Sequence, residues 1–300
     1  MQQDLDENTV TAAVLEQMAN TPNPRLKQVM ESLVKHLHDF ARDVDLTPEE
    51  WLYGIAFMTE IGKTCTPSRQ ETILLSDTLG LSALVNALHA KKNLAKATDP
   101  SLLGPFYRAA APMIAAGGSI CATPGQAPEI QFYGQVQDSS GNPIPHAQLT
   151  VWQTDAEGFY DMQLHGEEQM DHRAMLETDA SGHYSFRAVR PLGYYIPMDG
   201  PVGRMINAQL RHGCRPAHTH FLISAPGYAE LVTSLYFGDD QYIGTDTVFG
   251  VSRSLIIEPK MDAAAPISGI PAVHYVFTLS PQTAEGGGRV GADPSQLVKA

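Results

Sequence analysis

The chain has 300 residues, of which 43% are hydrophobic and 18% are charged, and its formal net charge is −13. This balance allows a sizeable buried core and excludes an intrinsically disordered chain. The negative charge and the lack of any run of Lys or Arg argue against nucleic-acid binding.

The N-terminal segment, residues 1–10, is polar and lacks the apolar core of a signal peptide. No apolar run approaches the length of a membrane span, so we expect no membrane association. The cysteines are odd in number and have no metal-type spacing, which argues against a disulfide framework and a Cys-rich zinc site. They are Cys65, Cys121 and Cys214. We therefore expect a cytoplasmic protein.

The first hundred residues predict a helical N-terminal domain, residues 1–100. Apolar residues recur at steps of three and four from Leu26 to Phe40, which is the pattern of an amphipathic helix. Thr47 and Glu50 have the spacing of a capping box, which predicts that the next helix begins there.

Residues 101–127 are rich in Gly, Pro and Ala and predict a linker that packs on the domain after it. Residues 128–300 then predict an antiparallel β-sandwich, because short alternating segments are separated by Gly, Pro, Asn and Asp. The predicted fold class is therefore α+β. The expected strands are residues 130–136, 148–153, 183–189, 215–224, 231–237 and 274–279.

His218 and His220 lie in one of these expected strands. Residues two apart on a strand point to the same face, so the two imidazoles can meet at one metal site. A His-x-His pair also occurs in sheets without any ligand role, and this alternative stays open on the pair alone.

Two further segments carry tyrosines. Tyr160 follows the strand that contains Trp152, and loops after strands often carry functional residues. Tyr194 and Tyr195 stand in residues 191–203, which are too rich in Pro and Gly for a regular element and predict a loop of fixed shape. In both places the aromatic ring can instead simply pack against the sheet.

Together these segments resemble the intradiol catechol dioxygenases. Tyr160, Tyr194 in a Pro-x-x-Tyr-x-Ile-Pro-x-Asp-Gly-Pro loop, and Arg-Pro-Ala-His-x-His from Arg215 follow the order and spacing of that family. The resemblance runs from the helical half through residues 103–107 to residues 248–250, and it is greatest to the hydroxyquinol 1,2-dioxygenases. It implies that the sandwich is transthyretin-like.

The resemblance implies one non-haem Fe(III) ion per subunit, bound by Tyr160, Tyr194, His218 and His220. Tyr194 is the expected ligand rather than Tyr195, because the ligand of the family stands two residues before Ile-Pro. Phenolate is a hard anionic donor that suits ferric iron, and imidazole also binds iron. The chemistry of the family is the opening of an aromatic diol by O2, in which Tyr194 and a bound hydroxide take up substrate protons.

The resemblance further implies that the substrate is hydroxyquinol (benzene-1,2,4-triol) and the product 3-hydroxy-cis,cis-muconate, the enol form of maleylacetate. The alternative is a catechol or chlorocatechol 1,2-dioxygenase that gives cis,cis-muconates. Catechol-type members have a glutamine near the iron where this chain has Ser234, which argues against plain catechol and leaves the role of Ser234 open. A non-catalytic carrier on the same sandwich is a third alternative, because a fold does not fix a function.

The family also implies a substrate pocket. Arg215 is expected there as a catalytic group that stabilises negative charge on the ring, although its odd separation from His218 on a strand requires a bend at Pro216. Asp77 is expected to accept a hydrogen bond from the third hydroxyl group of the triol, with a helix cap as the alternative role. The pocket positions are Leu74, Asp77, Leu102, Leu103, Gly104, Pro105, Phe106, Ile196, Pro197 and Val248.

The N-terminal helices of the family pair two subunits and can enclose a lipid-like molecule. We therefore expect a homodimer through residues 1–100. The apolar stripe from Leu26 to Phe40 can alternatively be ordinary core.

Overall fold

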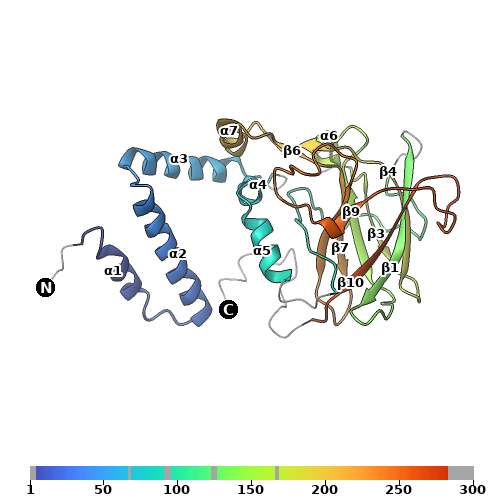
Figure 1. Ribbon diagram of the computed structural model, residues 1–300, viewed down its shortest axis with the longest axis horizontal. Coiled ribbons are helices and arrows are strands. Elements are labelled where there is room, and N and C mark those ends of the chain that lie inside the picture. The colour runs from blue at the N-terminus through green and yellow to red at the C-terminus, as the bar shows by residue number, and fades with distance from the viewer. Residues whose placement is uncertain (1–4, 67–68, 91–95, 123–126, 166–168, 283–300) are drawn as a thin grey trace. The chain divides into compact units, whose positions relative to one another are not determined.

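The computed structural model describes residues 5–66, 69–90, 96–122, 127–165 and 169–282 (Figure 1). The described residues belong to two compact units, residues 5–59 and residues 60–282. The predicted boundaries at residues 100 and 127 stay predictions, and the end of the predicted sandwich domain, residues 283–300, lies outside the described residues.

Local signals in the sequence explain where the N-terminal helices begin. The side chain of Asn23 accepts a hydrogen bond from the backbone N–H of Leu26 (2.9 Å) at the start of α2. The capping box at Thr47 and Glu50 is confirmed, with N–O distances of 3.0 and 3.2 Å. The helices are α1 (Val10–Gln17), α2 (Pro24–Asp43), α3 (Pro48–Thr64), α4 (Glu71–Thr78), α5 (Leu81–Ala90), α6 (Asp161–His165) and α7 (Pro201–Ala208), with a 3-10 turn η1 (Arg253–Leu255).

The predicted apolar stripe lies along α2 and is only partly exposed in the single chain. Val34 is buried and Met30 is half-buried. The other five members are between 44% and 55% exposed: Leu26, Val29, Leu33, Leu37 and Phe40. We call these five residues the α2 stripe. In the part of the chain that the structure describes, no single helix is long and apolar enough to cross a membrane; the bent pair α4 and α5 passes that test only when taken together.

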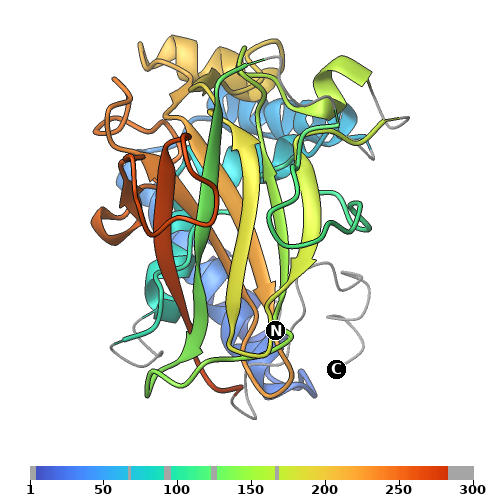
Figure 2. The ribbon, with the colours of Figure 1, turned by 90° about the vertical axis from the view of Figure 1, so that its right-hand side faces the viewer.

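Residues 60–282 contain a β-sandwich, as predicted from the short alternating segments. A three-stranded sheet has the order β10-β1-β4, and a five-stranded sheet has the order β3-β2-β7-β8-β9. Figure 2 shows the smaller sheet in front, with β10 in dark red beside β1 in green. The strands are β1 (Glu129–Asp138), β2 (Gln148–Gln153), β3 (Arg173–Glu177), β4 (His183–Val189), β5 (Tyr194–Tyr195), β6 (Cys214–Arg215), β7 (His218–Ser224), β8 (Leu231–Phe237), β9 (Ile256–Ile257) and β10 (Ala272–Leu279).

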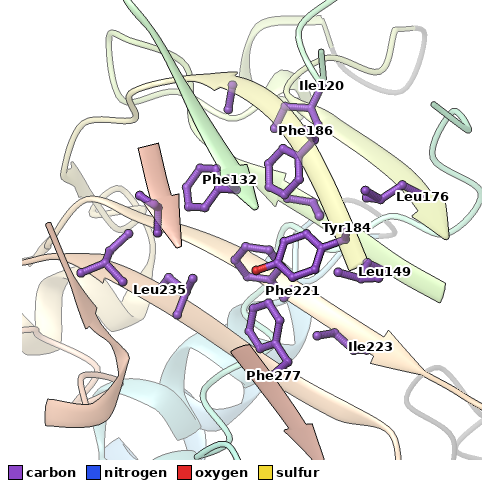
Figure 3. Packing of buried hydrophobic residues seen from close by; sticks show 14 of the residues in the cluster. Ile120, Phe132, Leu149, Leu176, Tyr184, Phe186, Phe221, Ile223, Leu235 and Phe277 are labelled. Carbon is purple, nitrogen blue, oxygen red and sulfur yellow. The ribbon is translucent and has the colours of Figure 1, made fainter. Parts of the chain in front are cut away.

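The core between the two sheets is built on aromatic rings (Figure 3). Phe132 on β1 stacks on Phe186 on β4, with 4.9 Å between ring centroids. Phe221 on β7 meets Phe132 edge-on at 6.0 Å, and its ring is tilted against that of Phe277 on β10 at 4.9 Å. These rings join the two sheets, because β7 belongs to the larger sheet and the other strands to the smaller one.

Several sequence predictions need correction. The sandwich is not purely antiparallel, because β10 runs parallel to β1 and β9 runs parallel to β8. The expected strand 215–224 is two strands, since Pro216 lies between β6 and β7 and lacks the N–H that a continuous ladder requires. The segment 191–203 contains β5 and the start of α7, where Pro201 suits the first helical turn.

The segment 101–127 packs on both sheets in its described part. Met113 forms a β-bridge with Met175 on β3, and Ser119 forms one with Arg187 on β4. The start of the segment is held at the larger sheet, where the backbone N–H of Ser101 donates to the carbonyl of Val232 on β8 (2.9 Å).

Candidate functional site

Strand β7 places His218 and His220 side by side. Both side chains are buried, and their Nε2 atoms are 3.0 Å apart. The Nδ1 atom of His218 lies 2.7 Å from the carbonyl oxygen of Pro216, which can only accept, so Nδ1 carries the hydrogen and Nε2 presents its lone pair. The Nδ1 atom of His220 is held by the hydroxyl of Ser234 at 3.0 Å. Outer contacts of this kind orient imidazoles that bind metals.

Tyr160 stands at the corner between β2 and α6 and points at the two histidines. Its hydroxyl lies 3.1 Å from Nε2 of His220 and 3.5 Å from Nε2 of His218. The ring of Phe106 stacks on the Tyr160 ring with a centroid distance of 4.3 Å. The phenol oxygen and two imidazole nitrogens therefore converge on one buried spot.

Tyr194 reaches the same place from β5. Its ring meets the ring of Tyr160 edge-on at 5.3 Å and lies 5.7 Å from the ring of His218. Tyr194 is 7% exposed, whereas Tyr195 is 63% exposed. Alternation along the strand thus turns Tyr194 inward and Tyr195 toward solvent. We call Tyr160, Tyr194, His218 and His220 the tyrosine–histidine cluster.

Arg215 also faces this cluster. It pairs with Tyr194 across the β5–β6 ladder, and the chain leaves that ladder at Pro216 before His218 begins β7. The odd separation from His218 therefore does not turn Arg215 away, because the two residues belong to different strands. Its NH1 atom lies 3.1 Å from Nε2 of His218 and 3.4 Å from the hydroxyl of Tyr194.

Burial shifts the pKa of both histidines and of Tyr160. Burial lowers the pKa of His218 and of His220 well below the ordinary value, and the charge of Arg215 lowers both further. Burial also raises the pKa of Tyr160 well above its ordinary value, and Tyr194 adds to that rise. Neutral imidazoles are the form that binds metals, and a cation at this spot would reverse the effect on the phenol by its own charge.

These donors fit a metal ion with mixed nitrogen and oxygen ligands. Among the residues that the structure describes, no three His, Cys, Asp or Glu side chains gather in a way that could hold a metal. A metal at the cluster therefore depends on phenolate oxygens beside the two imidazoles. Hard anionic oxygen donors suit a highly charged ion such as Fe(III).

Several predicted pocket residues lie against the cluster. A side chain at Gly104 would begin 3.6 Å from Cε1 of His220, so the loop backbone passes close to that ring. Phe106 contacts both tyrosines, and Leu103 packs on the same group. The pocket roles of six further residues stay predictions; Leu74, Leu102, Ile196 and Val248 are buried, and Pro105 and Pro197 are half-buried.

Asp77 lies in the last turn of α4 and is buried. Burial raises the pKa of its carboxyl group, the Ser82 hydroxyl lowers it by a hydrogen bond, and the charge of Arg215 also lowers it. The place of Asp77 at the end of α4 excludes a role as the N-cap of that helix, although its bond to Ser82 joins α4 to the first turn of α5.

Three residues at the site were missed from the sequence. Trp152 stacks on His220 at 4.8 Å, and Tyr236 and Asp246 both contact Arg215. Tyr236 lies opposite His218 in the β7–β8 ladder, as Ser234 lies opposite His220. The two expected strands that became β7 and β8 follow each other in the chain. Pairing them as a hairpin would have placed Tyr236 and Ser234 opposite the two histidines and on the same face.

Comparisons with known proteins agree with this site. A family profile described as "Dioxygenase" matches residues 103–281, and one described as "Catechol dioxygenase N terminus" matches residues 23–97. A 6-chlorohydroxyquinol 1,2-dioxygenase from Cupriavidus pinatubonensis is 43% identical over 93% of this chain and 99% of its own length. A hydroxyquinol 1,2-dioxygenase from Corynebacterium glutamicum is 44% identical over 90% of this chain and 88% of its own length.

A solved structure is also similar. It is a hydroxyquinol 1,2-dioxygenase from Pseudomonas putida DLL-E4, with 39% identity and a TM-score of 0.82 over 92% of this chain and 99% of that one. The two profiles together span most of the sequence, and the relatives match it nearly end to end. The chain therefore belongs to the intradiol ring-cleavage dioxygenase family.

Proposed function

We propose that this enzyme cleaves hydroxyquinol between its two adjacent hydroxyl-bearing carbons with O2, giving 3-hydroxy-cis,cis-muconate. The observation that carries the proposal is the convergence of Tyr160 Oη, His218 Nε2 and His220 Nε2 within 3.5 Å in a buried site. The names of the similar proteins support the choice of triol, and the arrangement around Arg215 supports binding of an anionic ring.

The tyrosine–histidine cluster would hold one Fe(III) ion, with Tyr160, Tyr194, His218 and His220 as ligands. When bound, ferric iron supplies a Lewis acid that draws electron density from the deprotonated diol and makes its ring reactive toward O2. Ser234 and the carbonyl of Pro216 keep the two imidazoles oriented for this role.

Three other tasks fall to residues of the chain: proton uptake, stabilisation of negative charge and exclusion of water. Tyr194 Oη is the proposed acceptor for a substrate hydroxyl proton, because it stands on a short strand and lies 3.4 Å from NH1 of Arg215. The Arg215 guanidinium also stabilises negative charge that develops on the ring. Phe106 covers the Tyr160 ring and excludes water from that side.

Asp77 is the proposed acceptor for the third hydroxyl group of the triol. Its carboxyl group is buried, and the charge of Arg215 acts on it, which supports a place for Asp77 in the same pocket. A buried acceptor left without a partner disfavours a substrate that lacks this hydroxyl. Catechol would therefore be the poorer substrate.

We further propose a cytoplasmic homodimer formed through the N-terminal helices, with a lipid-like molecule as a second occupant of the apolar surface. The exposed α2 stripe supports this, because monomers rarely leave a contiguous apolar face open to water. Sedimentation of the full chain tests it, and a monomer at micromolar concentration would reject the dimer.

The function is tested by the visible spectrum of the iron-loaded protein before and after anaerobic addition of hydroxyquinol, and separately of catechol. Phenolate-to-iron charge transfer predicts a wine-red protein whose band changes on binding each diol. Product analysis after admission of O2 should give a larger kcat/KM for the triol. A larger value for catechol favours the alternative catechol or chlorocatechol 1,2-dioxygenase, and a colourless protein with stoichiometric iron contradicts both.

A further inference from the structure

Arg215 is a cation buried beside a site that is proposed to bind another cation. Its side chain is 3% exposed, and its NH1 atom lies 3.1 Å from Nε2 of His218. A guanidinium out of water and close to a metal is strongly unfavourable unless a carboxylate balances it. The residue that supplies this balance therefore controls where the guanidinium points.

Asp246 supplies that balance. Its Oδ1 atom accepts from Nε of Arg215 at 3.1 Å, and its Oδ2 atom accepts from NH2 at 3.2 Å. This two-point geometry fixes the plane of the guanidinium and leaves NH1 directed at Tyr194 and His218. Among the described residues, Asp246 is the one carboxylate that forms an ion pair with Arg215.

The carboxylate of Asp246 is itself held in place. The backbone N–H groups of Val248 and Gly250 donate to it at 3.3 and 3.0 Å. The carbonyl of Gly250 accepts from Ser101 at 3.0 Å, and Ser101 also bonds to Tyr236 at 2.8 Å. The loop from Asp246 to Gly250 is thus tied to the larger sheet through Tyr236 on β8.

Gly250 shows how closely this network is packed. A Cβ atom at Gly250 would lie 2.6 Å from the hydroxyl of Tyr236 and 3.0 Å from NH2 of Arg215. No side chain fits there without moving the guanidinium or the tyrosine. The close approach requires glycine at this position, independently of its backbone angles.

We propose that Asp246 is a positioning residue for the ring-opening reaction, which neutralises Arg215 and holds its NH1 toward the tyrosine–histidine cluster. This inference rests on the proposed function.

The test compares Asp246→Asn with Asp239→Asn in the iron-loaded full-length protein. Asparagine keeps the shape of residue 246 but removes its charge. The control removes another Asp–Arg pair in the same loop, Asp239 with Arg190, whose aspartate is 61% exposed. For the Asp246 variant we expect kcat for hydroxyquinol to fall about 10²-fold, as for a misplaced catalytic group, while KM changes by less than about threefold. The control variant Asp239→Asn should have the same kcat and the same KM as the wild type.

A spectroscopic readout separates positioning from general loss of structure. Without Asp246, the guanidinium is no longer held toward the cluster and should stabilise the Tyr194 phenolate less. The charge-transfer band of Asp246→Asn should then move to longer wavelength at unchanged iron content. A band and a kcat equal to those of the control would overturn the inference, while a wild type that lacks the band and the activity would overturn the proposed function itself.

A second pair of variants applies if Asp246→Asn does not fold. Arg215→Met and the double variant Arg215→Met/Asp246→Asn should have the same kcat within about twofold, because Asp246 acts only through Arg215. The double variant should also unfold at a higher temperature than Arg215→Met, since it no longer buries a lone carboxylate. A further tenfold loss of kcat in the double variant would show that Asp246 acts without Arg215, which contradicts the inference.

Discussion

Tyr160 and Tyr194 border the same buried spot, but the chain holds them in different ways. Tyr160 is followed by Asp161, whose carboxylate forms a buried ion pair with Arg173, with Nε 2.7 Å from Oδ2. Arg173 also donates to the carbonyl of Phe106 at 3.1 Å, and Phe106 stacks on Tyr160. An ionic network and a stacked ring therefore fix Tyr160 from two sides.

Fewer contacts fix Tyr194 than fix Tyr160. It belongs to the two-residue strand β5, which pairs with the equally short β6, and its hydroxyl lies 3.4 Å from Arg215. Short ladders flanked by loops open at lower free energy than the central strands of a sheet. The contrast indicates one firmly anchored tyrosine and one that is held by fewer contacts, which suits the proposed role of Tyr194 as proton acceptor.

The largest effect is expected when Tyr160 or His220 is replaced. Replacing Tyr160 with Phe, or His220 with Ala, should abolish both the visible colour and the activity of iron-loaded protein. The loss of iron affinity should exceed the roughly 10- to 100-fold that the loss of an outer contact costs. Replacing Tyr194 with Phe should retain more iron than Tyr160→Phe while losing turnover. Equal iron loss in both tyrosine variants would contradict the contrast.

The ion pair beside Tyr160 should matter for stability. Asp161→Asn leaves Arg173 buried without its partner, which we expect to lower the free energy of unfolding by about 3–5 kcal/mol. The exposed pair removed by Asp239→Asn should cost no more than about 1 kcal/mol. Urea unfolding of the iron-free proteins measures the loss of free energy in both variants. Similar midpoints for the two variants would show that the buried Asp161 pair stabilises the fold no more than the exposed pair.

The same pair predicts a pH dependence. Burial raises the pKa of Asp161, but the hydrogen bonds and charge of Arg173 outweigh it and lower the pKa below its ordinary value. Its contribution to stability is therefore present above about pH 4, the usual pKa of an unfolded Asp, and is lost as the pH falls further. Stability curves measured from pH 6 to pH 2.5 should fall less steeply below pH 4 in Asp161→Asn than in the wild type.

A smaller effect is expected at Ser234, which fixes the imidazole of His220 through Nδ1. Ser234→Ala should weaken iron binding by about 10- to 100-fold without changing the ligands themselves. Competition with a chelator of known affinity gives this ratio. An unchanged affinity would mean that other contacts of His220, such as the stacked Trp152, already orient the ring.

The smallest effect concerns substrate choice. Asp77→Ala should reduce the preference for hydroxyquinol over catechol, measured as a ratio of kcat/KM, by about tenfold, because the variant no longer leaves a buried acceptor unpaired with catechol. An unchanged ratio would mean that Asp77 does not contact the substrate and instead has a structural role through its hydrogen bond with Ser82.

Local patterns in the sequence account for much of this site. The alternation along β7 was sufficient to place His218 and His220 on one face. The choice of Tyr194 over Tyr195 came instead from the resemblance to the family, and the structure buries Tyr194 and exposes Tyr195. The position of Arg215 could not be derived in this way, because it depends on the chain changing sheets at Pro216. Asp246 and Trp152 were missed for a similar reason: their contacts join segments whose relative register no local pattern records.

The central claim is a ferric centre formed by the tyrosine–histidine cluster, and anomalous diffraction tests it most directly. Crystals of the iron-loaded protein measured on both sides of the iron absorption edge should show one peak per subunit between Tyr160, Tyr194, His218 and His220. A peak elsewhere, a peak that follows the zinc edge, or no peak in active protein would contradict the claim.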